Sequence, residues 1–160
     1  MKALYIRRAT ADDTDLILQF IRELACYEKA EHAVKATAQD IHDSLFTGQA
    51  TAKALICSLG DQPVGFAVYF YNYSTWLGKP GIYLEDLYIQ PEHRGAGAGK
   101  ALLIYLAKKA LQQGCGRFEW SVLDWNQPAI DFYTSLGAKP QDEWTIYRLT
   151  GKDLEALAAR

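Results

Sequence analysis

The stretch IYLEDLYIQPEHRGAGAGKALLIYLAKKAL, residues 82–111, decides how this chain folds. Its apolar start predicts a strand, which is interrupted only by two adjacent acids, Glu85 and Asp86. A glycine-rich turn follows, and residues 97–113 then show the apolar spacing of an amphipathic helix. Backbone N–H groups at the start of such a helix suit a phosphate group. The pattern therefore indicates an enzyme that holds a phosphorylated cofactor beside a carboxylate base.

The rest of the chain alternates predicted strands and helices, without a repeat, a linker or a low-complexity tract. Alternation and β-branched or aromatic content predict strands at residues 3–8, 52–59, 64–73, 81–89, 117–123 and 144–149. Helical spacing and end signals predict helices at residues 12–29, 38–46, 97–113, 127–136 and 151–159. The turn at residues 60–63 predicts a hairpin. This order predicts a mixed α/β sheet with helices on its faces, in one domain over residues 1–160.

Composition limits the classes of partner. With a formal net charge of −2, the chain lacks the excess of Lys and Arg that nucleic acid needs, so we expect no nucleic-acid partner. We also expect no membrane partner, since no apolar run approaches about 18 residues. The three cysteines are widely spaced, and neither they nor the histidines show a metal-ligand spacing. We therefore expect no metal and a cytoplasmic protein, whose N-terminus lacks the apolar core of a signal peptide.

The glycine-rich turn does not fit the commoner phosphate-binding motifs. A P-loop would need a first glycine where Arg94 stands and Ser or Thr where Ala101 stands. The dinucleotide fingerprint fails as well, because its third glycine would fall on Lys100 or Leu102. The pattern R-x-x-G-x-G does fit, and it favours a pyrophosphate held by backbone amides with help from an arginine. A flexible strand-to-helix turn is the alternative.

The motif and its context resemble the acetyl-CoA loop of the GNAT N-acetyltransferases, and more narrowly the diamine (spermidine/spermine) acetyltransferase branch. The matching residues are Tyr27-Glu28, Trp76-Leu77-Gly78-Lys79, Tyr83-Leu84-Glu85-Asp86-Leu87, Arg94 to Gly99, Trp125-Asn126-Gln127-Pro128, Phe132-Tyr133 and Gly137-Ala138. The resemblance covers nearly the whole chain. It implies a GNAT fold, a mixed and mostly antiparallel sheet with a central splayed parallel pair and helices on both faces.

The resemblance also implies acetyl-CoA as cofactor, with CoA as product. Its pantetheine is expected along the strand after Glu85, and its pyrophosphate at the glycine-rich turn. The contacts implied are Leu87, Tyr88, Ile89, Arg94, Gly95, Ala96, Gly97, Ala98, Gly99, Lys100, Asn126, Ala129 and Tyr133. Asn126 can equally cap the helix that follows it.

Glu85 is the candidate general base. An alkylamine has a pKa of about 10.4, so a base must take its proton before it attacks a thioester at neutral pH. Strand alternation places Glu85 with Tyr83, Leu87 and Ile89, an apolar setting that should raise its pKa. Asp86 then faces the other way, unless the strand bulges and both acids reach the cleft. The alternative is an acid on a solvated edge strand.

Tyr133 is the candidate general acid. A phenol with a pKa of about 10 can protonate a leaving thiolate whose own pKa is about 8.5. Helical spacing aligns it with Ala129, Phe132 and Leu136, so a structural tyrosine is an equal reading from spacing alone. The family match at Asn126 and Phe132-Tyr133 favours the catalytic role.

The acceptor side is expected to bind a small cationic amine: a diamine, a polyamine or a thialysine-like amino acid. The carboxylates of Glu28, Glu85 and Asp86 can pair with such a cation, and the rings of Tyr27 and Trp76 can add aromatic faces. Two alternatives stay open. One is another acceptor, namely a protein lysine, a protein N-terminus or an antibiotic amine, and the other is a non-catalytic CoA-binding module. The resemblance also implies a homodimer.

Overall fold

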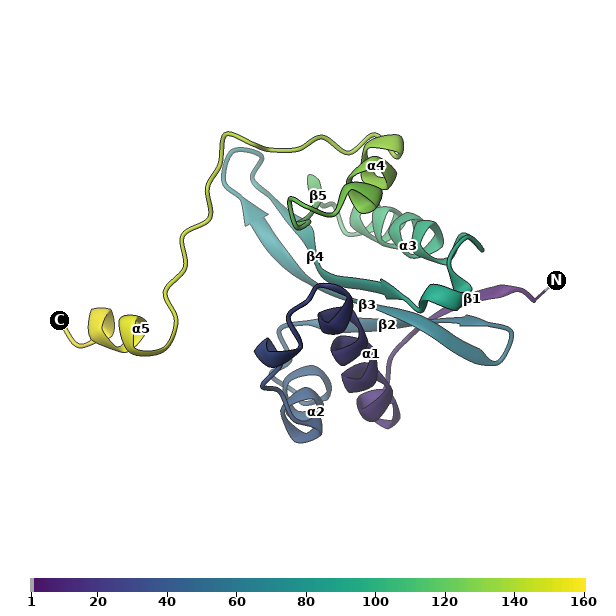
Figure 1. The fold of residues 1–160 in the computed structure, drawn as a ribbon. Helices are drawn as coiled ribbons and strands as arrows, with labels where there is room; N and C mark the ends of the chain where they lie inside the picture. The colour runs from purple at the N-terminus through teal and green to yellow at the C-terminus, as the bar shows by residue number, and fades with distance from the viewer. Residues whose placement is uncertain (1) are drawn as a thin grey trace. The chain divides into compact units, whose positions relative to one another are not determined.

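The computed structural model describes residues 2–160, which form two compact units, residues 2–121 and 122–160 (Figure 1). Each unit is described by itself. In the first, short 3-10 turns (η1 Ala11–Asp13, η2 Glu31–Ala33 and η3 Pro91–His93) join the main elements. These are β1 Leu4–Arg8, α1 Thr14–Tyr27, α2 Ala38–Phe46, β2 Lys53–Leu59, β3 Gln62–Ser74, β4 Lys79–Ile89, α3 Ala98–Gln112 and β5 Arg117–Trp120.

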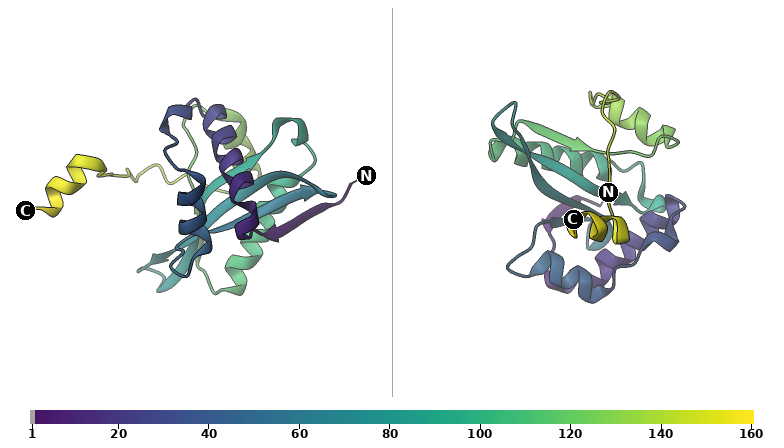
Figure 2. Two further views of the ribbon diagram at one scale, coloured as in Figure 1. Left: turned by 90° about the horizontal axis from the view of Figure 1, so that it is seen from below. Right: turned by 90° about the vertical axis from the view of Figure 1, so that its left-hand side faces the viewer.

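The first unit is built on a five-stranded sheet with the order β1-β2-β3-β4-β5. Strands β1 to β4 pair antiparallel, and β5 pairs parallel to β4. The expected hairpin joins β2 to β3 through Gly60, whose positive φ of 59° suits glycine. Helices α1 and α2 lie on one face of the sheet and α3 on the other (Figures 1 and 2). The mixed sheet with helices on both faces confirms the predicted fold class.

Local signals in the sequence start the helices. Asp13, just before α1, accepts hydrogen bonds from both terminal nitrogens of Arg7 at 2.7 Å and from the backbone N–H of Thr10 at 2.8 Å. Together these bonds fix the chain where β1 turns into α1. Helix α2 begins with a capping box in which Thr37 and Asp40 exchange hydrogen bonds between side chain and backbone.

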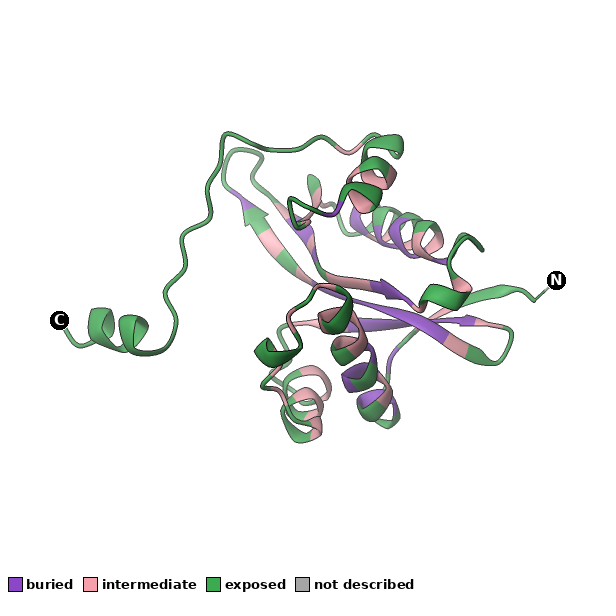
Figure 3. Ribbon diagram, viewed as in Figure 1, coloured by how far each residue is buried: buried purple, intermediate pink, exposed green. Residues whose placement is uncertain are grey.

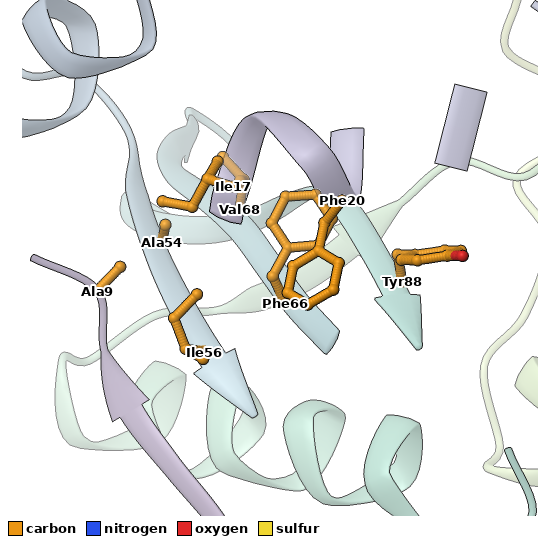
Figure 4. Packing of buried hydrophobic residues seen from close by; sticks show 8 residues of the cluster. All are labelled: Ala9, Ile17, Phe20, Ala54, Ile56, Phe66, Val68 and Tyr88. Atoms are coloured by element: carbon orange, nitrogen blue, oxygen red, sulfur yellow. The ribbon is translucent and has the colours of Figure 1, made fainter. Parts of the chain in front are cut away.

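The core lies on both faces of the central strands (Figure 3). On the α1 face, a cluster of buried residues joins α1 to β2, β3 and β4 (Figure 4); its members are Ala9, Ile17, Phe20, Ala54, Ile56, Phe66, Val68 and Tyr88. The ring of Phe20 lies 5.6 Å from that of Phe66 and 6.1 Å from that of Tyr88, between centroids. By alternation, Leu55 and Ala67 face the α3 side, where Leu102 and Leu106 are fully buried.

The second unit contains α4 Gln127–Ser135 and α5 Gly151–Ala158. The predicted strand at residues 144–149 is wrong, because the structure has no strand there. Its apolar side chains are exposed, Ile146 to 75% and Tyr147 to 94%. Alternation and β-branched content favour an extended chain, but a strand also needs a neighbouring strand to take up its backbone hydrogen bonds. The strand predicted at 117–123 is also shorter than expected and ends at Trp120.

Candidate active site

A β-bulge lies at the two adjacent acids of β4. Opposite β3, Leu84 pairs with Tyr69 and Asp86 pairs with Val68, which leaves Glu85 as the extra residue. A bulge of this kind interrupts the alternation of side chains and bends the strand locally. The sequence raised this bulge as the condition under which both acids could reach one cleft.

The bulge changes which residues share a face. Residues directly opposite each other in an antiparallel pair lie on the same face of the sheet. Asp86 therefore lies on the α1 face with its partner Val68, and Leu87 lies on the α3 face with its partner Ala67. Tyr83, whose ring lies 5.2 Å from that of Phe70, shares a face with Asp86. The expectation that Tyr83 and Leu87 share a face is wrong, because regular alternation stops at the bulge.

Electrostatics distinguish Asp86 from the two neighbouring acids, Glu85 and Glu28. Burial, together with the neighbouring charges of Glu85 and Glu28, raises the pKa of the Asp86 carboxyl to about 6. Burial also raises the pKa of Glu28, at the end of α1.

Glu85 itself is exposed, so the apolar setting that strand alternation predicted for its carboxyl is absent from this structure. The structure thus brings together three predicted acceptor residues, and the most perturbed carboxyl among them is Asp86.

The glycine-rich turn leads into α3, which begins at Ala98. Gly97 is its N-cap residue, with a left-handed φ of 83°, and Gly95 has a φ of 88°. A Cβ built on either glycine would meet no other atom within 4 Å. No side chain among the described residues caps this helix, so its first backbone N–H groups are available to an anion. These features fit a pyrophosphate, as the sequence motif predicts, and the family resemblance implies that it belongs to CoA.

Arg94 is held at the start of this turn. Its Nε donates a hydrogen bond to the carbonyl oxygen of Ile89, the last residue of β4, at 2.9 Å. Its guanidinium carbon lies 5.0 Å from the ring centroid of Tyr27 and 5.7 Å from that of Tyr88. The contact with Tyr27 joins the predicted cofactor loop to the end of α1. Sequence reasoning missed it, because the two residues are far apart in the chain and no local pattern links them.

The edge of β4 that faces β5 is open beyond Leu84. The parallel pairing runs only from Gly81 with Arg117 to Leu84 with Trp120, and β5 ends at Trp120. Residues 87–89, the predicted pantetheine contacts, lie in the part of β4 that β5 does not cover. Backbone groups on such an edge can pair with the amides of an extended ligand. β4 and β5 thus form the parallel pair that the family resemblance implied, but at the edge of the sheet and not at its centre, because β5 is the last strand in the order and no strand forms at residues 144–149.

The other residues predicted to bind the acceptor lie at the end of a helix or in a turn. Tyr27 is the last residue of α1 and is 38% exposed, and Glu28 follows it as the C-cap residue. Trp76 lies in the turn between β3 and β4 and is 85% exposed. An exposed ring of this kind can receive the cationic part of a ligand.

In the second unit, Asn126 caps α4. Its side-chain oxygen accepts a hydrogen bond from the backbone N–H of Ala129 at 3.4 Å, and the residue is buried. The expected capping role of Asn126 is therefore confirmed. Tyr133 is half-buried on α4, and its ring lies 5.7 Å from that of Phe132. Its predicted role as general acid stays a prediction.

Among residues 2–160, no group of His, Cys, Asp and Glu side chains is arranged to hold a metal ion. No helix in the same range has the length and apolar character needed to cross a membrane. The three cysteines, Cys26, Cys57 and Cys115, are free thiols.

Comparison with known proteins gives the family. Residues 18–138 match the model of the acetyltransferase (GNAT) family. The thialysine N-epsilon-acetyltransferase of Sus scrofa is 37% identical over 171 aligned positions, which cover 100% of both chains. The L-ornithine N5-acetyltransferase of Arabidopsis thaliana is 30% identical, covering 95% of this chain and 86% of that protein. A human spermidine/spermine N(1)-acetyltransferase-like protein is 34% identical, covering 99% of this chain and 24% of that protein.

Solved structures of similar proteins have the same fold as this chain. An integron cassette protein from the mobile metagenome of V. cholerae superposes with a TM-score of 0.84 at 28% identity, covering 100% of both chains. An aminoglycoside acetyltransferase from an uncultured soil metagenomic sample has the same fold, with a TM-score of 0.75 at 20% identity, covering 92% of this chain and 97% of that chain. With a family model matched over most of its length and full-length relatives above 30% identity, the chain belongs to the GNAT acetyltransferase family, whose members use acetyl-CoA.

Proposed function

We propose that this N-acetyltransferase acetylates the terminal side-chain amine of a small cationic amino acid, of the thialysine or ornithine type. The observation that carries the proposal is the cluster of Asp86, Glu85 and Glu28, in which burial and the two neighbouring charges raise the pKa of Asp86. A cationic acceptor relieves the repulsion among these carboxylates, and the same cluster would repel an anionic one. The full-length relatives that acetylate thialysine and the ornithine relative support this class of acceptor. Polyamines are the second candidate, supported by the spermidine/spermine-type relative.

The cofactor contacts proposed in the first unit are the glycine-rich turn and the edge of β4. Bound acetyl-CoA would supply the activated acetyl thioester. The backbone amides of residues 95–100 and the side chain of Arg94 would bind its pyrophosphate, because these donors stand at the N-terminus of α3. The open edge of β4 at residues 87–89 would hold the pantetheine. Asn126 and Ala129 are proposed as further contacts, from the family resemblance.

The proposed transfer is direct, without a covalent enzyme intermediate. Glu85 accepts the proton that the amine loses, directly or through a water molecule, as the new C–N bond forms. A backbone N–H at the open edge of β4 donates to the oxyanion. Tyr133 donates its phenolic proton to the sulfur as the C–S bond breaks, and it recovers a proton from solvent. Asp86 and Glu28 bind the second cationic group of the acceptor.

Three further proposals concern the protein as a whole. We propose that the two units work as a single domain over residues 1–160, since the family model spans their boundary at residues 121–122. A homodimer is proposed from the diamine acetyltransferase resemblance. A cytoplasmic location is proposed because free thiols persist in reducing compartments.

The test is release of the CoA thiol from acetyl-CoA across a panel of acceptors. The panel contains thialysine, ornithine, lysine, putrescine, spermidine, an aminoglycoside, a lysine peptide and, as matched control, butylamine, which has no second cation. We expect the highest kcat/KM with thialysine or ornithine. Asp86→Asn should raise KM for these acceptors and leave KM for butylamine unchanged, because only the former bring a second cation.

Other outcomes separate the alternatives. Preference for the lysine peptide or the aminoglycoside would replace the proposed acceptor class. Tight CoA binding without turnover on any amine would favour a CoA-binding module. Glu85→Gln should lower kcat about 100-fold at neutral pH without weakening CoA binding. An unchanged pH–rate profile in that variant would move the base to Asp86.

A further inference from the structure

Arg94 contacts three residues of the protein itself, namely Ile89, Tyr27 and Tyr88. Its Nε donates to the Ile89 carbonyl oxygen, and its guanidinium lies within 6 Å of the Tyr27 and Tyr88 ring centroids. Both ring distances fall in the range of cation–π attraction. Neither Nη group of Arg94 donates a hydrogen bond to another residue within the described range 2–160, which leaves both donors available to a ligand. The side chain is therefore placed while its donors stay available.

The two rings differ in how firmly they are held. Tyr88 is 5% exposed and belongs to the core cluster, where its ring packs against Phe20. Tyr27 is 38% exposed and ends α1. Helix α1 is also joined to the end of β4 by Glu23, which accepts a hydrogen bond from Nε2 of Gln90 at 3.3 Å. The ring of Tyr88 is therefore fixed by the core. The ring of Tyr27 lies at the end of α1, a helix that is hydrogen-bonded to Gln90 just after β4.

We propose that Tyr27 and Tyr88 are positioning residues for Arg94, which hold its guanidinium at the cofactor loop before the pyrophosphate arrives. This rests on the proposed function, in which Arg94 contacts the pyrophosphate. It gives Tyr27 a role on the cofactor side, in addition to the acceptor contact that the resemblance implies. It also joins the two sites, because Tyr27 is covalently next to Glu28 of the acid cluster.

The physical reason is the entropy of a long side chain. A free arginine loses rotamer freedom when it binds an anion, and this loss weakens binding. An arginine that is already held by aromatic faces has lost that freedom beforehand. A cation–π contact at an exposed site corresponds to about a two- to fivefold change in affinity. Loss of the Tyr27 ring should therefore weaken CoA binding about two- to fivefold.

The experiment measures the Kd of CoA by isothermal titration calorimetry for the full-length protein and its variants. Tyr27→Leu removes the ring, and Tyr27→Phe keeps it as the matched control. Tyr5→Leu, on a 59% exposed tyrosine of β1, controls for loss of a surface tyrosine. Arg94→Ala and the double variant Tyr27→Leu/Arg94→Ala complete a double-mutant cycle. The KM of S-acetylpantetheine, which lacks the pyrophosphate, serves as a second probe.

We expect Tyr27→Leu to raise the CoA Kd about two- to fivefold while Tyr27→Phe and Tyr5→Leu stay near the parent value. At a saturating acceptor concentration the acetyl-CoA KM should rise, and the KM of S-acetylpantetheine should not move. In the Arg94→Ala background, the Tyr27→Leu change should have no further effect. Full additivity of the two changes, or an equal effect on S-acetylpantetheine, would overturn the inference. An unchanged CoA Kd in Arg94→Ala would instead refute the proposed pyrophosphate contact.

Discussion

Replacing Asp86 by asparagine should stabilise the ligand-free protein, and the gain should depend on pH. Burial, together with the charges of Glu85 and Glu28, raises the pKa of Asp86 from 3.8 to about 6 in the folded protein. At about 1.4 kcal/mol per pH unit, that interval corresponds to about 3 kcal/mol of folding free energy. Because the folded value is the higher one, stability is fully present below pH 3.8 and is lost as pH rises to about 6.

Asparagine has nearly the shape of the protonated carboxyl and carries no charge. We therefore expect Asp86→Asn and the parent to unfold alike near pH 4. The variant should be more stable by about 3 kcal/mol above pH 6, as an upper figure for a half-buried group. Urea unfolding followed by circular dichroism from pH 4 to 8 measures this difference. Glu155→Gln, at an exposed acid of α5 that is not among the charges acting on Asp86, is the matched control. A difference between Asp86→Asn and the parent that stays constant over this pH range would refute the reasoning.

Three further outcomes can be measured. Tyr133→Phe should lower kcat about 100-fold without changing the CoA Kd, because only the proton donor is lost; an unchanged single-turnover rate of thiol release would end its assignment as general acid. Gly65→Ala should destabilise the fold by about 1–3 kcal/mol in urea, because a Cβ would collide with the backbone oxygen of Tyr88 and the side chain of Ile89; parent-like unfolding would show that β3 can move aside. Phe20→Ala, fully buried against Phe66, should cost about 3–5 kcal/mol, and a cost below 1 kcal/mol would contradict the packing described.

The sequence predicted most of the fold because its signals are local. Helix α2 begins and ends where its capping residue Thr37 and its apolar spacing indicate. The glycine turn, its position after β4 and the start of α3 at Ala98 also follow from short patterns. The strand predicted at residues 144–149 does not form, because a strand also depends on a partner strand that no local pattern specifies.

The candidate site was predicted less completely than the fold. The motif identified Glu85, Asp86 and Arg94, but it did not show which acid is perturbed. That depends on burial and on Glu28, which is distant in sequence and close enough in space to raise the pKa of Asp86. Likewise, the ring of Tyr27 reaches Arg94 only because α1 packs on the sheet beside the end of β4. Long-range contacts of this kind leave no trace in residue spacing.

The bulge at Glu85 gives β4 one position where the length of the strand can change without a change of register on either side. Substitution of Glu85 leaves every neighbour on its present face, since the residue has no partner across the ladder. Deletion of the same residue would place Leu84 directly before Asp86, opposite Tyr69 and Val68, so the ladder would become continuous and each residue would keep its face. Leu84 and Tyr88 would both stay in the cores that they now fill. Position 85 is therefore one at which β4 can lose a residue, as well as change it, without moving the core on either side.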